Sequence, residues 1–237
     1  IAGPGDSAPN SDVRKQCREE LGFRESDFVI LSLGGLVWRK GPLELLLCRR
    51  HLKNPMKILI AGSAMFDGRR PCQLRLFHRC VAHLELFLVQ VGVLDRLRYL
   101  YSLRTHCELE SIPKGQIKLL PLTSDIQPLI AASDVVVSLH NFPHSSRSVF
   151  EAWRQRRPVV VFAKSGASDG VRHCENGIIV ERKDPRCVAA ALDSLFEACT
   201  LRERIANNGQ LIAEKHHGEG AVIARLLKAY EKLTLSA

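Results

Sequence analysis

The sequence predicts an α/β fold: a doubly wound, Rossmann-like parallel sheet of about six strands with helices on both faces. Short, uninterrupted apolar runs, typical of strands buried on both faces, alternate along the 237 residues with longer segments of helical character. Each run ends at Gly, Pro or polar residues, as strands followed by loops do. The composition, 46% hydrophobic and 25% charged, excludes a disordered, collagen-like or coiled-coil chain.

The chain is expected to begin with a linker, because small residues dominate from Gly3 to Ser11. Ser11 caps the first helix, which ends at Leu21 because Gly22 supplies the stop. The expected organisation is a linker with a leading helix, a Rossmann-like domain, and a carboxy-terminal helix packing on or beyond it, in residues 1–24, 25–216 and 217–237.

Six apolar runs predict the strands. They are Phe28 to Leu33, Lys57 to Ala61, Ile117 to Leu120, Val135 to Leu139, Val159 to Phe162 and Ile178 to Val180. The segments around them predict helices at Pro42 to Arg50, one or two within Arg70 to His106, Ile126 to Ala132, Ser148 to Gln155, Pro185 to Cys199, Leu201 to His216 and Glu219 to Leu235. Strands alternating with helices predict a parallel sheet, and such sheets bind ligands beyond the carboxyl ends of their strands.

The loop after the first strand, GGLVWRKG over residues 34–41, is the first candidate binding element. Gly34 and Gly35 let a ligand approach the backbone, and Lys40 places a cation before the next helix, where a phosphate would lie. A tight turn with a surface lysine would explain the same residues, so both interpretations stay open. The loop is not a Walker motif, because the spacing and the Ser/Thr are absent.

A second candidate loop runs from His140 to Ser148 and opens a helix. Free amides at the helix start, three serine hydroxyls and Arg147 predict an anion site. Ser148 and Glu151 also have the S-x-x-E spacing of a capping box, so capping and ligand binding compete for this carboxylate. The nine histidines form no catalytic set; His140 and His144 flank the loop and fit turn positions equally well.

A third loop, Ser165 to Gly170, is rich in small residues and follows a strand, although a simple β-to-α turn also explains it. The loops after Ala61 and Leu120 offer weaker candidates, Gly62-Ser63 and Thr123-Ser124-Asp125.

The first loop and a later stretch of about 50 residues together match the pattern of a known family. The later stretch, ASDVVVSLHNFPHSSRSVFEAWRQRRPVVVFAKSGASDGVRHCENGIIV, contains Glu151-Ala152, Pro158-Val159-Val160 and Asn176-Gly177 at matching positions. The run from Leu31 to about Gln210 thus resembles the nucleotide-sugar-binding, carboxy-terminal half of the group 1, retaining GT-B glycosyltransferases. The family's first loop reads G-R-L-x-x-x-K-G, and the chain keeps its glycines and its lysine.

This resemblance implies one half of a GT-B fold and a retaining hexosyltransferase that uses a nucleoside diphosphate sugar. It implies that Lys40 binds the phosphates, that Glu151 binds the ribose, and that the acceptor lies on an amino-terminal domain or a partner chain. No metal or other cofactor is expected, since no carboxylate pair or His cluster has ligand spacing. The full set of expected donor-binding residues is Gly34, Lys40, Ser146, Arg147, Ser148, Glu151, Gly166 and Asp169.

Four positions depart from the family pattern. Pro143 cannot accept a hydrogen bond as the family glutamate does, and each replaced catalytic group could cost several kcal/mol, or about 10²-fold in rate. Stabilisation of the diphosphate would then rest on Lys40, Arg147 and the helix-start amides. The replacements are Gly35 for Arg, Pro143 for the first of two glutamates, Ser165 for the first Gly of a G-G loop, and Asp169 for Glu.

The net charge indicates which class of partner to expect, and the cysteine pattern indicates the redox compartment. The 34 Lys and Arg against 25 Asp and Glu give a net charge of +9, which favours anionic partners. The eight cysteines form no CxxC pair, which favours buried free thiols and the cytoplasm or another reducing compartment. No apolar stretch reaches the roughly 20 residues of a transmembrane helix. No signal peptide is visible, and the chain is expected to begin after processing or inside a longer polypeptide.

Two functions fit these observations. The first is a glycosyltransferase donor domain. The second is a catalytically degenerate relative that serves as a basic structural or accessory subunit of a larger complex, with or without RNA. Within this non-enzyme class, a small α/β module that binds RNA through its basic helices is a further alternative. The replacements at Gly35 and Pro143 favour the second interpretation, and fold alone does not decide between them.

Overall fold

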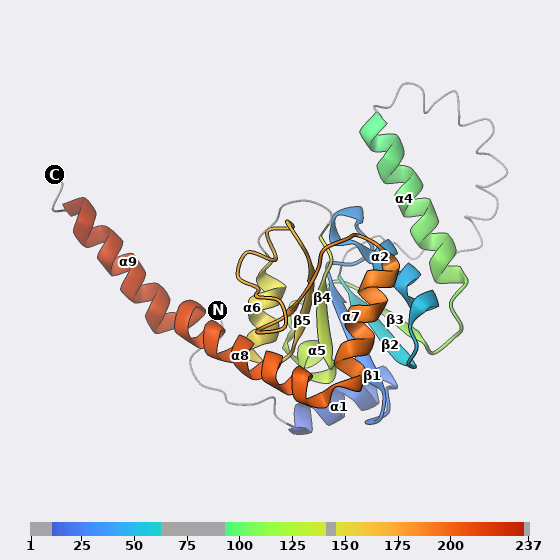
Figure 1. The fold of residues 1–237 in the computed structure, drawn as a ribbon, viewed down its shortest axis with the longest axis horizontal. Coiled ribbons are helices and arrows are strands. Elements are labelled where there is room, and N and C mark those ends of the chain that lie inside the picture. The colour runs from blue at the N-terminus through green and yellow to red at the C-terminus, as the bar shows by residue number, and fades with distance from the viewer. Residues whose placement is uncertain (1–10, 63–92, 141–145, 235–237) are drawn as a thin grey trace.

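The computed structural model describes residues 11–62, 93–140 and 146–234 (Figure 1). Its parallel sheet has the strand order β3-β2-β1-β4-β5-β6, which confirms the predicted doubly wound, Rossmann-like α/β fold. The strands are β1 (Phe28–Leu33), β2 (Met56–Ala61), β3 (Ile117–Leu120), β4 (Val135–Ser138), β5 (Val159–Phe162) and β6 (Ile178–Val180).

The helices lie close to the predicted segments. They are α1 (Ser11–Leu21), α2 (Pro42–Cys48), α4 (Val93–Glu110), α5 (Gln127–Ala132), α6 (Arg147–Arg154), α7 (Pro185–Glu197), α8 (Cys199–His217) and α9 (Glu219–Thr234), with 3-10 turns η1 (Trp38–Lys40) and η2 (Arg49–His51). The predicted helical segment Arg70 to His106 lies partly outside the described residues, and α4 continues beyond its predicted end to Glu110.

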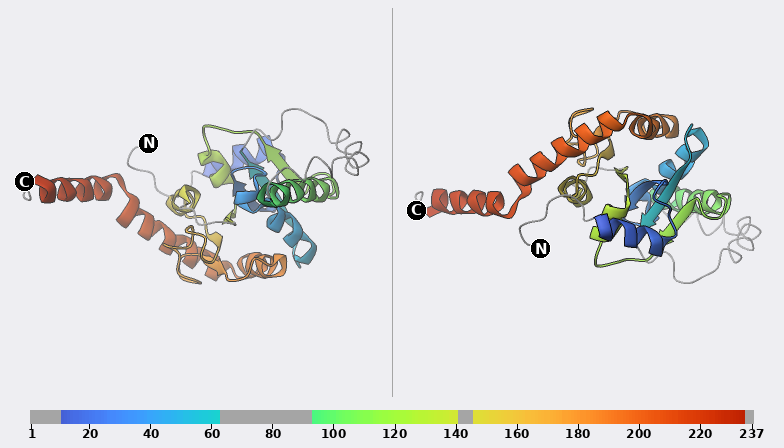
Figure 2. Two further views of the ribbon diagram at one scale, coloured as in Figure 1. Left: turned by 90° about the horizontal axis from the view of Figure 1, so that it is seen from above. Right: turned by 90° about the horizontal axis from the view of Figure 1, so that it is seen from below.

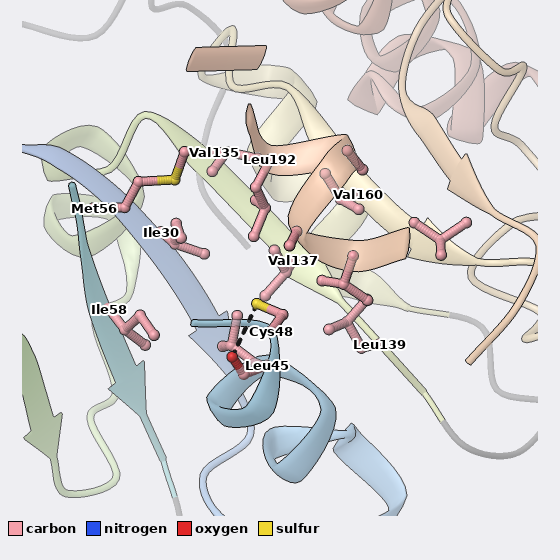
Figure 3. Packing of buried hydrophobic residues seen from close by; sticks show 14 of the residues in the cluster. Ile30, Leu45, Cys48, Met56, Ile58, Val135, Val137, Leu139, Val160 and Leu192 are labelled. Carbon is pink, nitrogen blue, oxygen red and sulfur yellow. Dashed lines mark hydrogen bonds between the residues drawn. The ribbon is translucent and has the colours of Figure 1, made fainter. Parts of the chain in front are cut away.

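Two apolar layers cover the sheet because successive side chains of each strand point to opposite faces. Ile30, Val137 and Val160 pack with Leu45 and Cys48 of α2 and with Leu192 of α7, as Figure 3 shows. On the other face, strand residues pack against α1, α5, α6 and the end of α8; they are Val29, Leu31, Leu59, Ala61, Val136, Val159 and Val161. The central strands are therefore buried on both sides, as a parallel sheet requires.

The edge strand β3 differs from the prediction of burial on both faces. Ile117, Leu119 and Leu120 are only partly buried and Lys118 is exposed. The cause is its position at the edge, where it pairs with β2 on one side alone.

Helix α1 is fixed to the amino ends of the strands by a buried guanidinium. Arg18, with 1% of its surface exposed, donates to the backbone carbonyls of Arg24, Glu25, Asp27 and Ala132. Its Nη2 also lies 2.7 Å from Oδ2 of Asp134. The same carboxylate oxygen accepts the amide of Val29 at 2.7 Å. Nη2 of Arg14 lies 2.7 Å from the other oxygen, Oδ1, so two ion pairs to Asp134 tie α1 to β1 and to the start of β4.

The last helix, α9, contacts α8 and extends away from the sheet in all three views (Figures 1 and 2). Five large apolar side chains on it are exposed: Val222, Ile223, Leu226, Leu227 and Tyr230. Within the ranges described, no helix combines the length and the apolar composition needed to cross a membrane.

The cysteines only partly follow the prediction of buried thiols. Cys17 and Cys48 are buried, and Cys48 donates to the carbonyl of Leu45 (Figure 3). Cys107, on α4, and Cys199, at the start of α8, are exposed. All six cysteines in the described ranges are free thiols; Cys72 and Cys80 lie outside them.

Candidate functional site

A cavity of about 620 Å³ opens at the carboxyl ends of the strands. The neighbouring strands β1 and β4 diverge in connectivity there, since β1 leads to β2 on one side and β4 leads to β5 on the other. In open parallel sheets this switch point is where ligands bind. The lining residues are Leu33, Gly34, Lys40, Ala61, Gly62, Leu122, Thr123, Ile126, Ser146, Arg147, Ser148 and Glu151.

The glycine loop after β1 forms one wall. The amides of Gly34 and Gly35 donate to the carbonyl of Ala61 at 2.8 and 3.1 Å, which holds the loop against the end of β2. Gly34 has a φ of 118°, and a Cβ built on it would stand 2.9 Å from the side-chain carbons of Lys40. The glycine at this position therefore leaves the room in which the stem of Lys40 lies.

Lys40 brings a half-buried ammonium to the cavity. Its Nζ lies 3.0 Å from Nε2 of His140, the residue that follows the end of β4 by two positions. Burial lowers the pKa of Lys40 from its ordinary value. A cation that is partly stripped of water attracts an anion more strongly than a fully hydrated surface lysine does.

The start of α6 forms the opposite wall, and here the capping-box interpretation is wrong. The helix begins at Arg147, so Ser148 lies inside its first turn and Ser146 is the N-cap. No side chain caps this helix end. The hydroxyl of Ser146 is instead 2.7 Å from that of Ser148, and both residues line the cavity.

Glu151 lies one turn further along α6, beside the cavity. Nε of Arg147 lies 3.1 Å from its Oε1, but the side chain of Arg147 is 87% exposed. Burial raises the pKa of Glu151, and the nearby charges of Arg147 and Arg154 oppose that rise without cancelling it. The carboxylate is thus poorly hydrated and suited to accept hydrogen bonds from ligand hydroxyls.

The structure gathers six of the eight predicted donor-binding residues, and Gly166 and Asp169 do not line the cavity. They lie in the loop after β5, where Gly166 has a φ of 70° and Asp169 is exposed. The hydroxyl of Ser165 turns inward to the carbonyl of Phe162 at 2.6 Å. Pro143 and His144 lie outside the described residues.

The sequence pattern did not predict the apolar part of the cavity lining. Leu33, Leu122 and Ile126 border it, and Leu122 is 77% exposed. The only sequence signal was the pair of weak candidate loops after β2 and β3, which do contribute Gly62 and Thr123. Which apolar residues flank such loops depends on how the strands are ordered in the sheet.

His140 is a second residue whose environment the sequence did not indicate, since its pattern fitted an ordinary turn position. It is 2% exposed, and its Nδ1 lies 2.9 Å from the hydroxyl of Ser138 at the end of β4. No group of three or more His, Cys, Asp or Glu side chains in the described part of the chain is placed to hold a metal ion.

Taken together, the cavity presents a cation, several hydroxyls and helix-start amides, a carboxylate and an apolar patch. An anionic group suits Lys40 and the amides, ligand hydroxyls suit Glu151, and a planar ring suits the surface around Leu122 and Ile126. A ligand with all three chemical parts fits this arrangement, and the volume is that of a small-molecule site.

The chain is similar in sequence to known proteins. The sequence model of the family described as glycosyl transferases group 1 matches residues 13–211. A D-inositol 3-phosphate glycosyltransferase from Xylanimonas cellulosilytica is 25% identical over 225 residues, which cover 95% of this chain and 47% of that protein.

Two solved structures have the same fold. HepE from Anabaena in complex with UDP gives a TM-score of 0.70 at 20% identity over 94% of this chain and 53% of HepE. The carboxy-terminal domain of a group 1 glycosyl transferase, LpcC from Francisella tularensis, gives a TM-score of 0.60 at 20% identity. The match covers 88% of this chain and 95% of that domain. The chain thus spans about half the length of HepE and less than half of the curated relatives that it matches.

Proposed function

The chain belongs to the group 1 glycosyl transferases, and we propose that it is a donor domain that binds a nucleoside diphosphate sugar in the cavity beyond β1 and β4. The observation that carries this proposal is the convergence of Lys40 and the start of α6 on one cavity at the switch point of the sheet. A diphosphate would lie between them, and the base would lie against Leu33, Leu122 and Ile126.

Within this proposal each polar group has one task. The ammonium of Lys40 and the free amides at the start of α6 bind the diphosphate and stabilise the charge that develops as it leaves the sugar. Glu151 accepts hydrogen bonds from ribose hydroxyls. Gly166 and Asp169 would reach the sugar only from the rim, since neither borders the cavity in this structure.

The proposed reaction is transfer of a hexose with retention of configuration at its anomeric carbon. The acceptor would lie on a second domain or a partner chain. Two observations support such a partner. The matched relatives are about twice as long as this chain or longer. The exposed apolar residues of α9 also recur at helical spacing on one side, as a helix covered by another protein segment would show.

The replacement of the family arginine by Gly35 is the observation that favours a second candidate function, that of an accessory subunit without catalysis. Gly35 has a φ of 68°, its amide donates to the carbonyl of Ala61, and it is buried behind the cavity lining, so it offers no guanidinium to a phosphate. A domain that has lost catalysis and serves as a basic accessory subunit would keep the fold and the charge of +9 but not nucleotide affinity.

Calorimetric titration of the chain with UDP, GDP and ADP separates the two functions. The donor-domain proposal expects saturable heat with at least one of them. Absence of both heat and a thermal shift at millimolar nucleotide would favour the accessory-subunit function.

A further inference from the structure

Three buried polar side chains are connected to the lining of the cavity: Ser146 is part of it, and His140 and Ser138 contact the lining residues Lys40 and Ser146. Ser138 is 4%, His140 2% and Ser146 4% exposed. Together they form one continuous chain of hydrogen bonds that links Lys40 to Ser148. The distances are 3.0 Å from Lys40 Nζ to His140 Nε2, 2.9 Å from His140 Nδ1 to Ser138 Oγ, 2.8 Å from Ser138 Oγ to Ser146 Oγ, and 2.7 Å from Ser146 Oγ to Ser148 Oγ.

The chemistry of Lys40, at one end of the chain, fixes the direction of these bonds. The ammonium of Lys40 has three protons and no acceptor, so Nε2 of His140 must accept. A neutral imidazole with an accepting Nε2 carries its proton on Nδ1, and therefore donates to Ser138. A protonated His140 would have two donors and would face the ammonium with a like charge, which breaks the chain.

The serine hydroxyls continue the same direction. Ser138 accepts from His140, and its own buried proton has Ser146 as the remaining partner among the described residues. Ser146 in turn donates to Ser148. Ser148 then accepts at its oxygen, and its proton is left as a donor in the lining of the cavity.

We propose that His140 is a positioning residue for phosphate binding: held neutral with its proton on Nδ1, it fixes the ammonium of Lys40 and orients the Ser138 and Ser146 hydroxyls so that Ser148 donates into the cavity. The nature of the ligand rests on the proposed function, whereas the direction of the hydrogen bonds does not. One cation and one hydroxyl donor, which come from opposite walls, are thereby aligned before any ligand arrives, and such alignment reduces the cost of binding.

A role limited to holding α6 in place does not explain this arrangement. Ser146 is the N-cap of α6, yet its hydroxyl does not cap the helix. It is committed to Ser138 and Ser148 instead. Among the residues that the structure describes, the charged groups lining the cavity are Lys40 from η1 and Arg147 and Glu151 from α6, and Glu151 pairs with Arg147.

Long-range proton–nitrogen NMR spectra of the histidine rings test the direction without any ligand. The expected spectrum shows His140, identified by its loss in His140→Gln, as a neutral ring protonated on Nδ1 at pH 7. Lys40→Met should change this tautomer, because Nε2 then loses its donor, and should leave the signals of His51 unchanged. A ring protonated on Nε2, or on both nitrogens, would overturn the proposal.

Binding measurements test the consequence, with UDP and uridine as the probes. His140→Gln reaches Lys40 but not Ser138, and His140→Asn reaches Ser138 but not Lys40. Each should weaken UDP about 3- to 10-fold, and His140→Ala about tenfold or more, while uridine affinity stays unchanged because it has no phosphate. His51→Gln, in η2 beyond the carboxyl end of α2, is the matched control and should change neither.

The outcomes separate the two proposals. Equal losses for UDP and uridine in the His140 variants would mean that His140 only supports the fold, and unchanged UDP affinity would also refute the positioning role. If the wild-type chain binds no nucleotide, the proposed function fails, and the NMR result alone decides the hydrogen-bond direction.

Discussion

Gly41 lies so close to Leu139 that a Cβ built on Gly41 would stand 2.0 Å from the backbone oxygen of Leu139. Gly41 also has a φ of 67°, in the left-handed region. This contact presses the residue after Lys40 against the residue before His140. The approach of the first loop to the end of β4, and with it the pairing of Lys40 with His140, therefore depends on a glycine at position 41.

Gly41→Ala is expected to destabilise the protein by about 3 kcal/mol or more, because steric overlap with backbone adds to the cost of the left-handed conformation. Gly22→Ala is the matched control: Gly22 has a φ of 75° but open space around it, so about 1 kcal/mol is expected. Urea denaturation measures both. Equal losses would show that the contact with Leu139 has no energetic weight.

Arg18→Ala should cost about 3 to 5 kcal/mol in the free energy of unfolding, because it leaves several backbone carbonyls without their buried donor, although Asp134 keeps its pair with Arg14. Arg172→Ala removes an exposed ion pair with Glu175 and should cost less than about 1 kcal/mol. Chemical denaturation of the two variants checks the difference. A loss for Arg18→Ala as small as that of the surface variant would contradict the assigned role.

Lys40→Ala should weaken UDP binding by about 1 to 3 kcal/mol, or about 5- to 150-fold, through loss of a charge-assisted contact with phosphate. Uridine affinity should not change. Arg39→Ala removes the same charge from an exposed neighbouring position, and calorimetry should find less than about a twofold effect at physiological salt. If both variants lose UDP affinity alike, the effect is general electrostatics rather than a contact of Lys40.

Glu151→Gln tests a carboxylate whose pKa burial raises. Since the folded-state pKa lies above the unfolded value, the charged form costs stability above the folded pKa, and this cost disappears as the pH falls to the unfolded value near 4.5. The variant should therefore gain stability relative to wild type between pH 4 and pH 7, while nucleotide affinity falls by about 1 kcal/mol or more.

Glu175→Gln is the control for that prediction, because Glu175 is a half-exposed partner of Arg172 far along the chain from the cavity. Denaturation curves at both pH values and nucleotide titrations measure the two effects. A Glu151→Gln variant with unchanged affinity would remove Glu151 from the proposed ribose site.

Much of the fold could be predicted from the sequence because local signals were unambiguous. Runs such as Val159–Phe162 have no helical periodicity, and Gly22 ends α1 where expected, with a φ of 75°. The position of each strand in the sheet could not be predicted in this way, because it depends on contacts between distant segments. The partial exposure of β3 follows from its place at the edge, which only the strand order reveals.

The candidate site was predictable in part for the same reason. Lys40 and Ser146 stand in loops after strands, and the switch point brings them to one cavity. The place of Ser148 in α6 was mispredicted, because S-x-x-E spacing does not define which serine begins the helix. The partnership of His140 with Lys40 joins residues 100 positions apart and leaves no trace in local sequence.

A crystal structure of the chain with UDP tests the central claim most directly. The account predicts the diphosphate between the two walls of the cavity, with phosphate oxygens about 3 Å from Nζ of Lys40 and from Oγ of Ser148, and the ribose beside Glu151. A nucleotide bound elsewhere on the surface, or a cavity that stays empty at millimolar UDP, would contradict it.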